Sequence, residues 1–349
     1  MLKRILQVTL VGLCLLGGGT FAFMATGPAT GMAAGQTDED AMTEQVQAGF
    51  PDAPEEVRAV AAVIIAGGVP DMAALQALGP EMLNRSWSAT GTRGRPMDGH
   101  GLLRQAVLSL NPAAAEALVA AGADVRFNEG EMPYLAVSTV SADKDLWFPD
   151  FSDGNRLLRL WLQAGGDPNA AWPGDSIGPG LHMVPEQNLE AVLILLAAGA
   201  NPWFEPPFPG ADPDDPIRSA SYFEKLANAS PIANEIAFRI AREGHYRGGP
   251  RDVVDKVMDR YERTAGLYVG STGPENLHLI WAMQKALALI VEQTDTRPGP
   301  HVAALLDTQV REGIGGFFLA AGELHSPRDD DQLLRSDNQT GSELWHDDK

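Results

Sequence analysis

The chain has 349 residues, of which 44% are hydrophobic, so it is long enough and apolar enough to bury a core. Its 46 acidic residues outnumber its 26 basic ones, and the net charge of −20 repels phosphate backbones and anionic lipid headgroups. The charge therefore argues against nucleic acid as a partner.

An apolar segment without charged side chains occupies residues 5–25, directly after Lys3 and Arg4. As a helix it would be about 32 Å long, which is enough to cross a bilayer. The basic residues before it and the acidic run Asp38-Glu39-Asp40 after it favour a cytoplasmic N-terminus. We expect residues 1–25 to anchor the chain in the inner membrane of a Gram-negative-type cell, with the remainder in the periplasm. Alternatively, residues 1–25 are a signal peptide whose cleavage releases the protein into the periplasm.

The chain has a single cysteine, Cys14, which lies inside the apolar segment. A lipoprotein signal requires a small residue directly before the cysteine, and Leu13 stands there, so the sequence does not favour lipid attachment. With no second cysteine the exported part has no disulfide and is held by packing alone.

Residues 26–53 are rich in Gly, Ala, Thr and acidic side chains without apolar periodicity, which predicts a flexible acidic linker with order beginning near Pro54. Helical spacing of apolar residues then predicts helices over 55–66 and 71–78, the second with Asp71 as its N-cap. Together they form a first helix pair. Residues 86–97 contain several helix breakers and are predicted to be a projecting loop.

Three later segments end alike, each directly after an apolar helical run: Ala121-Gly122-Ala123-Asp124, Ala164-Gly165-Gly166-Asp167 and Ala198-Gly199-Ala200-Asn201. The glycine is expected to take the left-handed conformation that closes a helix C-terminus. Gly165 and Gly199 are 34 positions apart, close to the 33-residue period of ankyrin repeats. The longer spacings from Gly122 to Gly165 and from Gly199 to Gly244 correspond to one period plus roughly ten to twelve inserted residues.

The start of each helix pair shows a weaker pattern, in three segments: Asp98-Gly99-His100-Gly101-Leu102-Leu103-Arg104-Gln105-Ala106, Gly130-Glu131-Met132-Pro133-Tyr134-Leu135-Ala136-Val137 and Leu181-His182-Met183-Val184. These segments resemble the ankyrin opening, in which a turn glycine precedes Thr-Pro-Leu-His-x-Ala. A fifth pair is predicted over 219–246. The resemblance implies an all-α fold, an ankyrin-like helical solenoid of about five degenerate helix pairs over residues 54–246. Tetratricopeptide-like repeats have a similar period of about 34 residues, but the Gly-Ala-Asp ends favour the ankyrin interpretation.

Beyond the array, amphipathic helices are predicted over 252–264 and 275–293, with one more inside 301–321. Solenoids need terminal units with a polar outer face, so residues 247–322 are interpreted as a C-terminal helical cap. Residues 323–349 lose all periodicity and are predicted to be a disordered acidic tail.

Motifs for catalysis and for cofactor binding are not found in the sequence. Residues 269–273 have the wrong spacing for a nucleophile turn, and residues 313–316 lack the Lys-Ser/Thr of a phosphate loop. No histidine stands three or four residues from another, so no metal motif is present. We therefore expect no enzyme, no cofactor and no metal site.

Ankyrin-repeat proteins are generally non-catalytic scaffolds, so the resemblance implies a protein-protein interaction scaffold whose partner is another protein. One alternative is an immunity-type protein that neutralises an exported toxic effector. Another is a hydrolase that uses His182 or His245 with nearby carboxylates. Because His182 falls on the histidine of the ankyrin opening, the resemblance implies instead that its ring bonds neighbouring turns.

Aromatic side chains in the inserted, Pro-rich or irregular segments are the candidate partner-binding residues: Trp147, Phe148, Trp172, Trp203 and Phe204. Aromatic anchors on projecting loops are typical of binding hot spots. The alternative is that these rings fold back and cover the helix stack.

Overall fold

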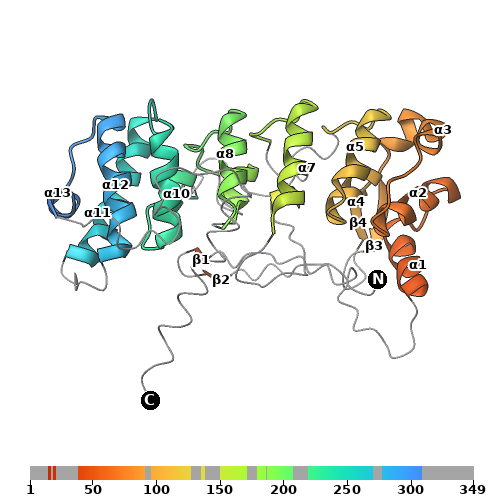
Figure 1. Cartoon of the computed structure of the whole chain (residues 1–349), viewed down its shortest axis with the longest axis horizontal. Helices are drawn as coiled ribbons and strands as arrows, with labels where there is room; N and C mark the ends of the chain where they lie inside the picture. Colours follow the sequence, from red (N-terminus) through yellow and green to blue (C-terminus); the bar gives the residue numbers. More distant parts are fainter. Residues whose placement is uncertain are drawn as a thin grey trace, which may run out of the picture. The chain divides into compact units, whose positions relative to one another are not determined.

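The computed structural model describes residues 15–16, 19–20, 38–90, 96–126, 135–137, 150–170, 179–185, 187–206, 219–269 and 277–308. Helices predominate in these residues, which confirms the predicted all-α class, and the described strands form two short antiparallel pairs (Figure 1). The chain divides into an N-terminal unit, Met1–Ser219, and a C-terminal unit, Ala220–Lys349. This boundary lies inside the predicted array of residues 54–246.

Little of the predicted membrane segment 5–25 is described. Its described residues form β1 (Leu15–Leu16) and β2 (Gly19–Thr20), which pair antiparallel. The anchor helix stays a prediction because the other residues of the segment lie outside the described part of the chain. Among the described helices, none combines the length and the apolar character needed to span a bilayer.

Helix α1 (Asp38–Gly49) lies within residues 26–53, where the sequence predicted a linker. It contacts α2 and β3, while Val46 is 8% exposed and Phe50 is fully buried. These two side chains stand four positions apart and share one helix face. Their burial holds an otherwise polar helix in place, so order begins before Pro54.

The predicted first helix pair is present as α2 (Glu55–Ile65) and α3 (Met72–Leu83). Asp71 is the N-cap of α3, as predicted, and its carboxylate accepts a hydrogen bond from the Ala73 backbone N–H. Helix α3 runs past its predicted end at residue 78 through a kink at Gly79, whose φ is 70°.

The prediction of a loop over residues 86–97 was wrong for residues 87–90 and 96–97, which are strand, whereas residues 91–95 lie outside the described part of the chain. Strands β3 (Trp87–Thr90) and β4 (Pro96–His100) form an antiparallel hairpin that pairs Trp87 with His100 and Thr90 with Pro96. Trp87 is only 4% exposed, and its ring centroid lies 5.9 Å from that of Phe50. Burial of the indole fixes an extended segment whose local breakers alone predict a loop, and Pro96 is tolerated because it begins its strand.

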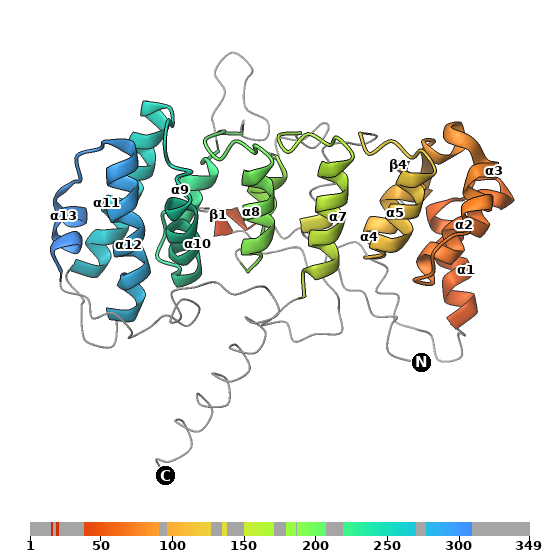
Figure 2. The same ribbon diagram turned by 45° about the horizontal axis from the view of Figure 1, so that its top comes forward.

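The other elements of the N-terminal unit are α4 (Leu102–Leu108), α5 (Pro112–Ala120), α7 (Ser152–Gln163), the 3-10 helix η2 (Gly180–Met183) and α8 (Leu189–Ala197). Helix α4 packs against α2 and α5, α5 against α3 and α7, and α8 against α7 and η2. Figures 1 and 2 both draw α5, α7 and α8 side by side. Leu135–Val137, from the predicted opening of the third pair, are helical and buried.

Two buried asparagines each cap one helix and also bind the preceding helix pair. Asn111 Oδ1 accepts from the Ala114 N–H at 3.0 Å, and its Nδ2 donates to the Gly68 carbonyl at 2.8 Å. The amide of Asn188 caps α8 in the same way and exchanges two hydrogen bonds with the Asn155 amide, at 3.0 and 3.1 Å. Each N-cap asparagine therefore stabilises the start of its own helix and also the packing of that helix against the preceding pair.

The C-terminal unit contains the helices predicted for the fifth pair, α9 (Tyr222–Leu226) and α10 (Pro231–Arg242), and the predicted cap helices. The cap helices are α11 (Arg251–Val269), α12 (Leu277–Thr294) and α13 (Pro300–Asp307). Helix α10 packs against α9 and α12, and α11 packs against α9 and α13. The buried rings of Phe223 and Tyr246 stack at 3.9 Å.

Side chains of α11 and α12 cap the two ends of α13. The Glu262 carboxylate accepts from the backbone N–H groups of His301 and Val302 at 2.7 and 3.0 Å, and Gln284 Nε2 donates to the carbonyls of Leu305 and Thr308 at 2.8 and 2.7 Å. The groups that a short helix leaves unpaired are thus satisfied at both ends. The predicted disordered tail, residues 323–349, lies outside the described residues.

Candidate interaction surface: the turns of the N-terminal unit

The three glycines of the recurring helix ends adopt the left-handed conformation that the sequence predicted. Their φ angles are 105° at Gly122, 96° at Gly165 and 92° at Gly199. The residue after each glycine donates its backbone N–H to a carbonyl five positions earlier: Ala123 to Leu118, Gly166 to Trp161 and Ala200 to Leu195, at 2.9 to 3.0 Å. This is the same helix-ending motif three times. Gly244 ends α10 in the same way, with φ 85°.

The polar residue that follows each of these three turns closes a second small ring. The side-chain oxygens of Asp124, Asp167 and Asn201 accept from the backbone N–H two positions later, at 2.9, 2.9 and 3.0 Å. Asp and Asn are favoured in this Asx-turn because their short side chains reach their own backbone. The recurring sequence ending therefore encodes two consecutive backbone motifs, a left-handed helix ending and an Asx-turn.

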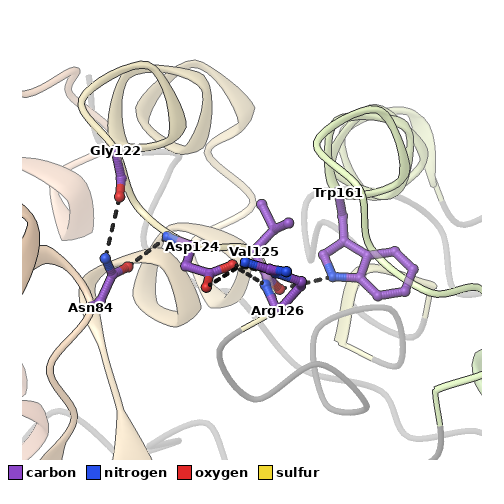
Figure 3. A network of polar contacts seen from close by, with 6 residues as sticks. All are labelled: Asn84, Gly122, Asp124, Val125, Arg126 and Trp161. Atoms are coloured by element: carbon purple, nitrogen blue, oxygen red, sulfur yellow. Dashed lines mark hydrogen bonds and ion pairs between the residues drawn. The ribbon is translucent and has the colours of Figure 1, made fainter.

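An asparagine side chain bridges two of these turns to the segment before them. Asn84 Nδ2 donates to the Gly122 carbonyl at 3.2 Å, and its Oδ1 accepts from the Asp124 N–H at 2.5 Å (Figure 3). Asn169 makes the same two hydrogen bonds to the turn at Gly199. Its Nδ2 donates to the Gly199 carbonyl at 3.0 Å and its Oδ1 accepts from the Asn201 N–H at 2.7 Å. We call this pair of hydrogen bonds the asparagine bridge.

Between the turns at Gly122 and Gly165 the connection is different. Arg126 occupies the position equivalent to Asn169, since each stands four residues after the glycine of its turn, Gly122 or Gly165. Arg126 forms no asparagine bridge and instead pairs with Asp124 of its own turn at 3.1 Å. The link is made instead by Trp161, whose Nε1 donates to the Val125 carbonyl at 3.1 Å (Figure 3). The hydrogen bonds from Arg126 lower the pKa of the exposed Asp124 carboxyl.

Two ion pairs connect the helices behind the turns. Arg156 of α7 binds Glu116 of α5 through two hydrogen bonds of 2.9 Å, and Arg159 of α7 binds Glu190 of α8 at 2.7 Å. All four side chains are more than a third exposed, so each pair adds at most about 1 kcal/mol. These ion pairs therefore orient α7 relative to α5 and α8 more than they stabilise the folded unit.

Replacing Asn169 with alanine removes both bonds of its bridge and is expected to lower the free energy of unfolding of the N-terminal unit by about 1 kcal/mol. Asn201→Asp is the matched control. Aspartate already fills the equivalent place at Asp124, so this variant should be neutral within about 0.5 kcal/mol. Urea unfolding measures both, and equal losses for the two variants would contradict the bridge.

The structure describes two of the five predicted binding residues. Trp203 is half-buried and directly follows the turn at Gly199, with its backbone N–H bound to Asn201. Phe204 is half-buried, and its ring meets the His182 ring edge-on at 6.2 Å. Trp147, Phe148 and Trp172 lie outside the described residues.

The two histidines of the hydrolase alternative lie in different environments. His182 is 4% exposed, on η2 in the N-terminal unit. His245 follows α10 in the C-terminal unit, where its Nε2 lies 3.4 Å from a Glu243 carboxylate oxygen. In the part of the chain that the structure describes, no three His, Cys, Asp or Glu side chains converge on a metal position.

Two strongly perturbed titratable groups, His100 and Glu235, are not among the residues predicted to be functional. Burial, reinforced by the Arg104 charge, lowers the pKa of His100 to about 4, and its ring bonds Arg104 and Gln105 at 2.7 and 2.9 Å. Burial also raises the pKa of Glu235 on α10 to about 7. The His100 shift has no sequence signal, because part of its burial comes from a residue distant in the chain: the Phe50 ring lies 4.9 Å from the His100 ring.

No protein-family model matches this chain, and no curated protein is similar enough to it to count as a match.

Proposed function

We propose that this protein is a non-catalytic interaction scaffold in which residues 54–246 carry ankyrin-like helix pairs stacked as a solenoid. The asparagine bridge is the observation that supports the proposal most. Asn84 and Asn169 use the same two side-chain atoms to hold the same two backbone groups of the following turn. Tandem modules need such recurring contacts because each has to present the same faces to its neighbours.

The turns offer a surface suited to a protein partner. Arg126 and Asp124 side chains are 68% and 42% exposed at one turn, and the half-buried Trp203 indole follows another. A large aromatic side chain with a polar surround is the usual composition of a protein-protein hot spot. The proposed binding surface is therefore the row of turns at Gly122, Gly165 and Gly199, with Trp203 as its anchor.

The proposed location is the periplasmic face of the inner membrane, with residues 1–25 as the anchor. The support for this is the apolar, uncharged segment 5–25 behind Lys3 and Arg4. A partner is then expected among exported or envelope proteins.

The test is capture of a partner from crosslinked cell envelopes by the full chain. We expect one protein to be enriched over an unrelated anchored control, and its enrichment to depend on the turn surface. Equal recovery with the chain and with the control would count against a scaffold.

Trp203→Ala is expected to reduce partner recovery at least about tenfold, while the melting temperature changes by no more than about 2 °C. Trp161→Ala is the matched tryptophan control: its ring is 3% exposed, so truncation should cost about 3–5 kcal/mol. Calorimetry and envelope capture are measured on both variants. If Trp203→Ala unfolds as early as Trp161→Ala, Trp203 is a packing residue and not a binding anchor.

A further inference from the structure

The C-terminal end of helix α1 lies against the buried ring of His100. Gly49, the last residue of α1, comes so close that a Cβ atom there would lie 3.1 Å from His100 Nε2. Phe50 follows directly, and its ring centroid lies 4.9 Å from that of His100 and 5.9 Å from that of Trp87. His100 and Trp87 pair with each other across strands β4 and β3. The His100 ring therefore lies at the junction of α1 with the strand pair.

The hydrogen bonds of the His100 ring admit only its neutral form. Arg104 Nη1 lies 2.7 Å from Nδ1, and since a guanidinium can only donate, Nδ1 accepts and carries no proton. Nε2 therefore carries the proton and donates to Gln105 Oε1 at 2.9 Å, while Gln105 Nε2 donates to Ser109 Oγ at 2.9 Å. A second proton, on Nδ1, would direct an N–H group of the ring at an N–H group of Arg104. The ring can bind that proton only by leaving its place.

The surroundings of the ring also disfavour a positive charge. The side chains that the neighbouring elements bury at this junction are apolar in the part of the chain that the structure describes: Val46 and Phe50 in and after α1, Trp87 of β3, and Val57, Val60, Ala61 and Ile64 of α2. Helix α4 adds the neutral Gln105 and the positive charge of Arg104, both next to the ring. Burial first, and the Arg104 charge second, lower the pKa of His100 to about 4.

Helix α1 is attached to the N-terminal unit by few buried side chains. Among residues 42–49 only Val46 is buried, and Glu44 and Gln47 are exposed. Helix α1 contacts α2 and β3 (Figure 1), whereas α5, α7 and α8 pack against one another further along the unit. An element that buries little surface opens at a lower free energy than the helices of a core. These contacts therefore allow α1 to detach while the later helices stay folded.

We propose that His100 is an acid-sensitive switch: protonation of its ring detaches α1 and Phe50 from the N-terminal unit, while the later helix pairs stay folded. Detachment brings the charged ring into water and uncovers the Trp87 indole. The 12 residues of α1 span about 18 Å as a helix and up to about 40 Å when extended. Acid thereby lengthens the connection between residues 1–37 and the first helix pair. This inference does not depend on the proposed scaffold function.

The test is amide hydrogen exchange of the full chain from pH 7 to pH 4, expressed as protection against the unfolded chain at the same pH. The reporters are the amides of residues 46–50, which include the Phe50 N–H that donates to the Val46 carbonyl at 2.9 Å. The pKa of His100 is about 4 with α1 in place and 6.5 in water, so the equilibrium constant for detachment should rise about a hundredfold. Protection of the reporters should fall by the same factor.

The amides of α8 are the internal reference for unfolding of the whole unit. We expect them to stay at least about a hundredfold better protected than residues 46–50 at every pH, because α1 detaches without unfolding of the unit. Equal protection of α1 and α8 throughout would show that α1 leaves only when the unit unfolds, and would overturn the proposal.

Two variants assign the acid effect to the ring. His100→Gln should remove the pH dependence of the reporters, whereas the matched histidine control His245→Gln, in the C-terminal unit, should keep it. Gln105→Glu has almost the same shape and gives the protonated ring a carboxylate, to which the Ser109 hydroxyl can donate. It should reduce the hundredfold change to less than about tenfold. Retention of the parent pH profile in either His100→Gln or Gln105→Glu would contradict the switch.

Discussion

Gly166→Ala is expected to destabilise the N-terminal unit by about 2–3 kcal/mol, although it adds only one methyl group. A Cβ atom at Gly166 would overlap the ring of Trp161, which is 3% exposed and held by its hydrogen bond to the Val125 carbonyl. Because the ring is buried and held by this hydrogen bond, we expect the overlap to be relieved by strain in the turn. Urea unfolding measures the loss.

The equivalent residues of the other two turns indicate which second substitution restores the stability lost in Gly166→Ala. Where Gly166 follows Trp161 by five positions, Ala123 follows Leu118 and Ala200 follows Leu195 with the same hydrogen bond. The smaller leucine leaves room for the alanine Cβ. In a Trp161→Leu background, Gly166→Ala is therefore expected to cost no more than about 0.5 kcal/mol, a coupling of about 2 kcal/mol in a double-mutant cycle. Independent, additive losses would mean that the three turns are not equivalent.

Acid is expected to weaken the N-terminal unit by about 3 kcal/mol through His100 alone. Its pKa is about 4 in the folded chain, below the ordinary value of 6.5, mainly because the ring is buried and also because Arg104 lies beside it. Between these two values the unfolded chain binds a proton that the folded chain does not. The stabilisation is therefore complete above pH 6.5 and is lost as the pH falls toward 4.

The acid effect of His100 has to be measured within the N-terminal unit, because the contribution of Glu235 in the C-terminal unit to the free energy of unfolding changes with pH in the opposite direction. Its folded pKa of about 7 lies above the ordinary 4.5, so its contribution is present below pH 4.5 and is lost as the pH rises through 7. Hydrogen exchange of the α4 amides isolates the His100 effect from whole-chain melting. His100→Gln should remove the acid dependence of the protection factors of these amides, meaning their exchange rates relative to the unfolded chain at the same pH, between pH 6.5 and 4. An unchanged dependence would assign it to another group.

Features fixed by local chemistry could be predicted from the sequence. The helix-ending glycines are left-handed at Gly122, Gly165 and Gly199, because a glycine after an apolar helical run adopts this conformation without steric cost. Asp71 caps α3 for an equally local reason. The helices predicted for the fifth pair and for the cap are present because their apolar residues recur at the helical period.

Features that depend on contacts distant in sequence could not be predicted. The strand pair β3–β4 and helix α1 are held by Trp87 and Phe50, which pack against each other across a large sequence separation. The asparagine bridges have no fixed spacing either: Asn84 lies 38 positions before its glycine, and Asn169 lies 30 positions before its own. Inserted segments change these distances while the turns still meet.

Amide hydrogen exchange at Asp124 and Asn201 tests the stacking of successive helix pairs most directly. Each backbone N–H is bound by an asparagine from the segment before it. We predict slow exchange at both amides in the full chain, with Asn84→Ala accelerating exchange only at Asp124 and Asn169→Ala only at Asn201. Fast exchange at both amides in the parent chain would contradict the account.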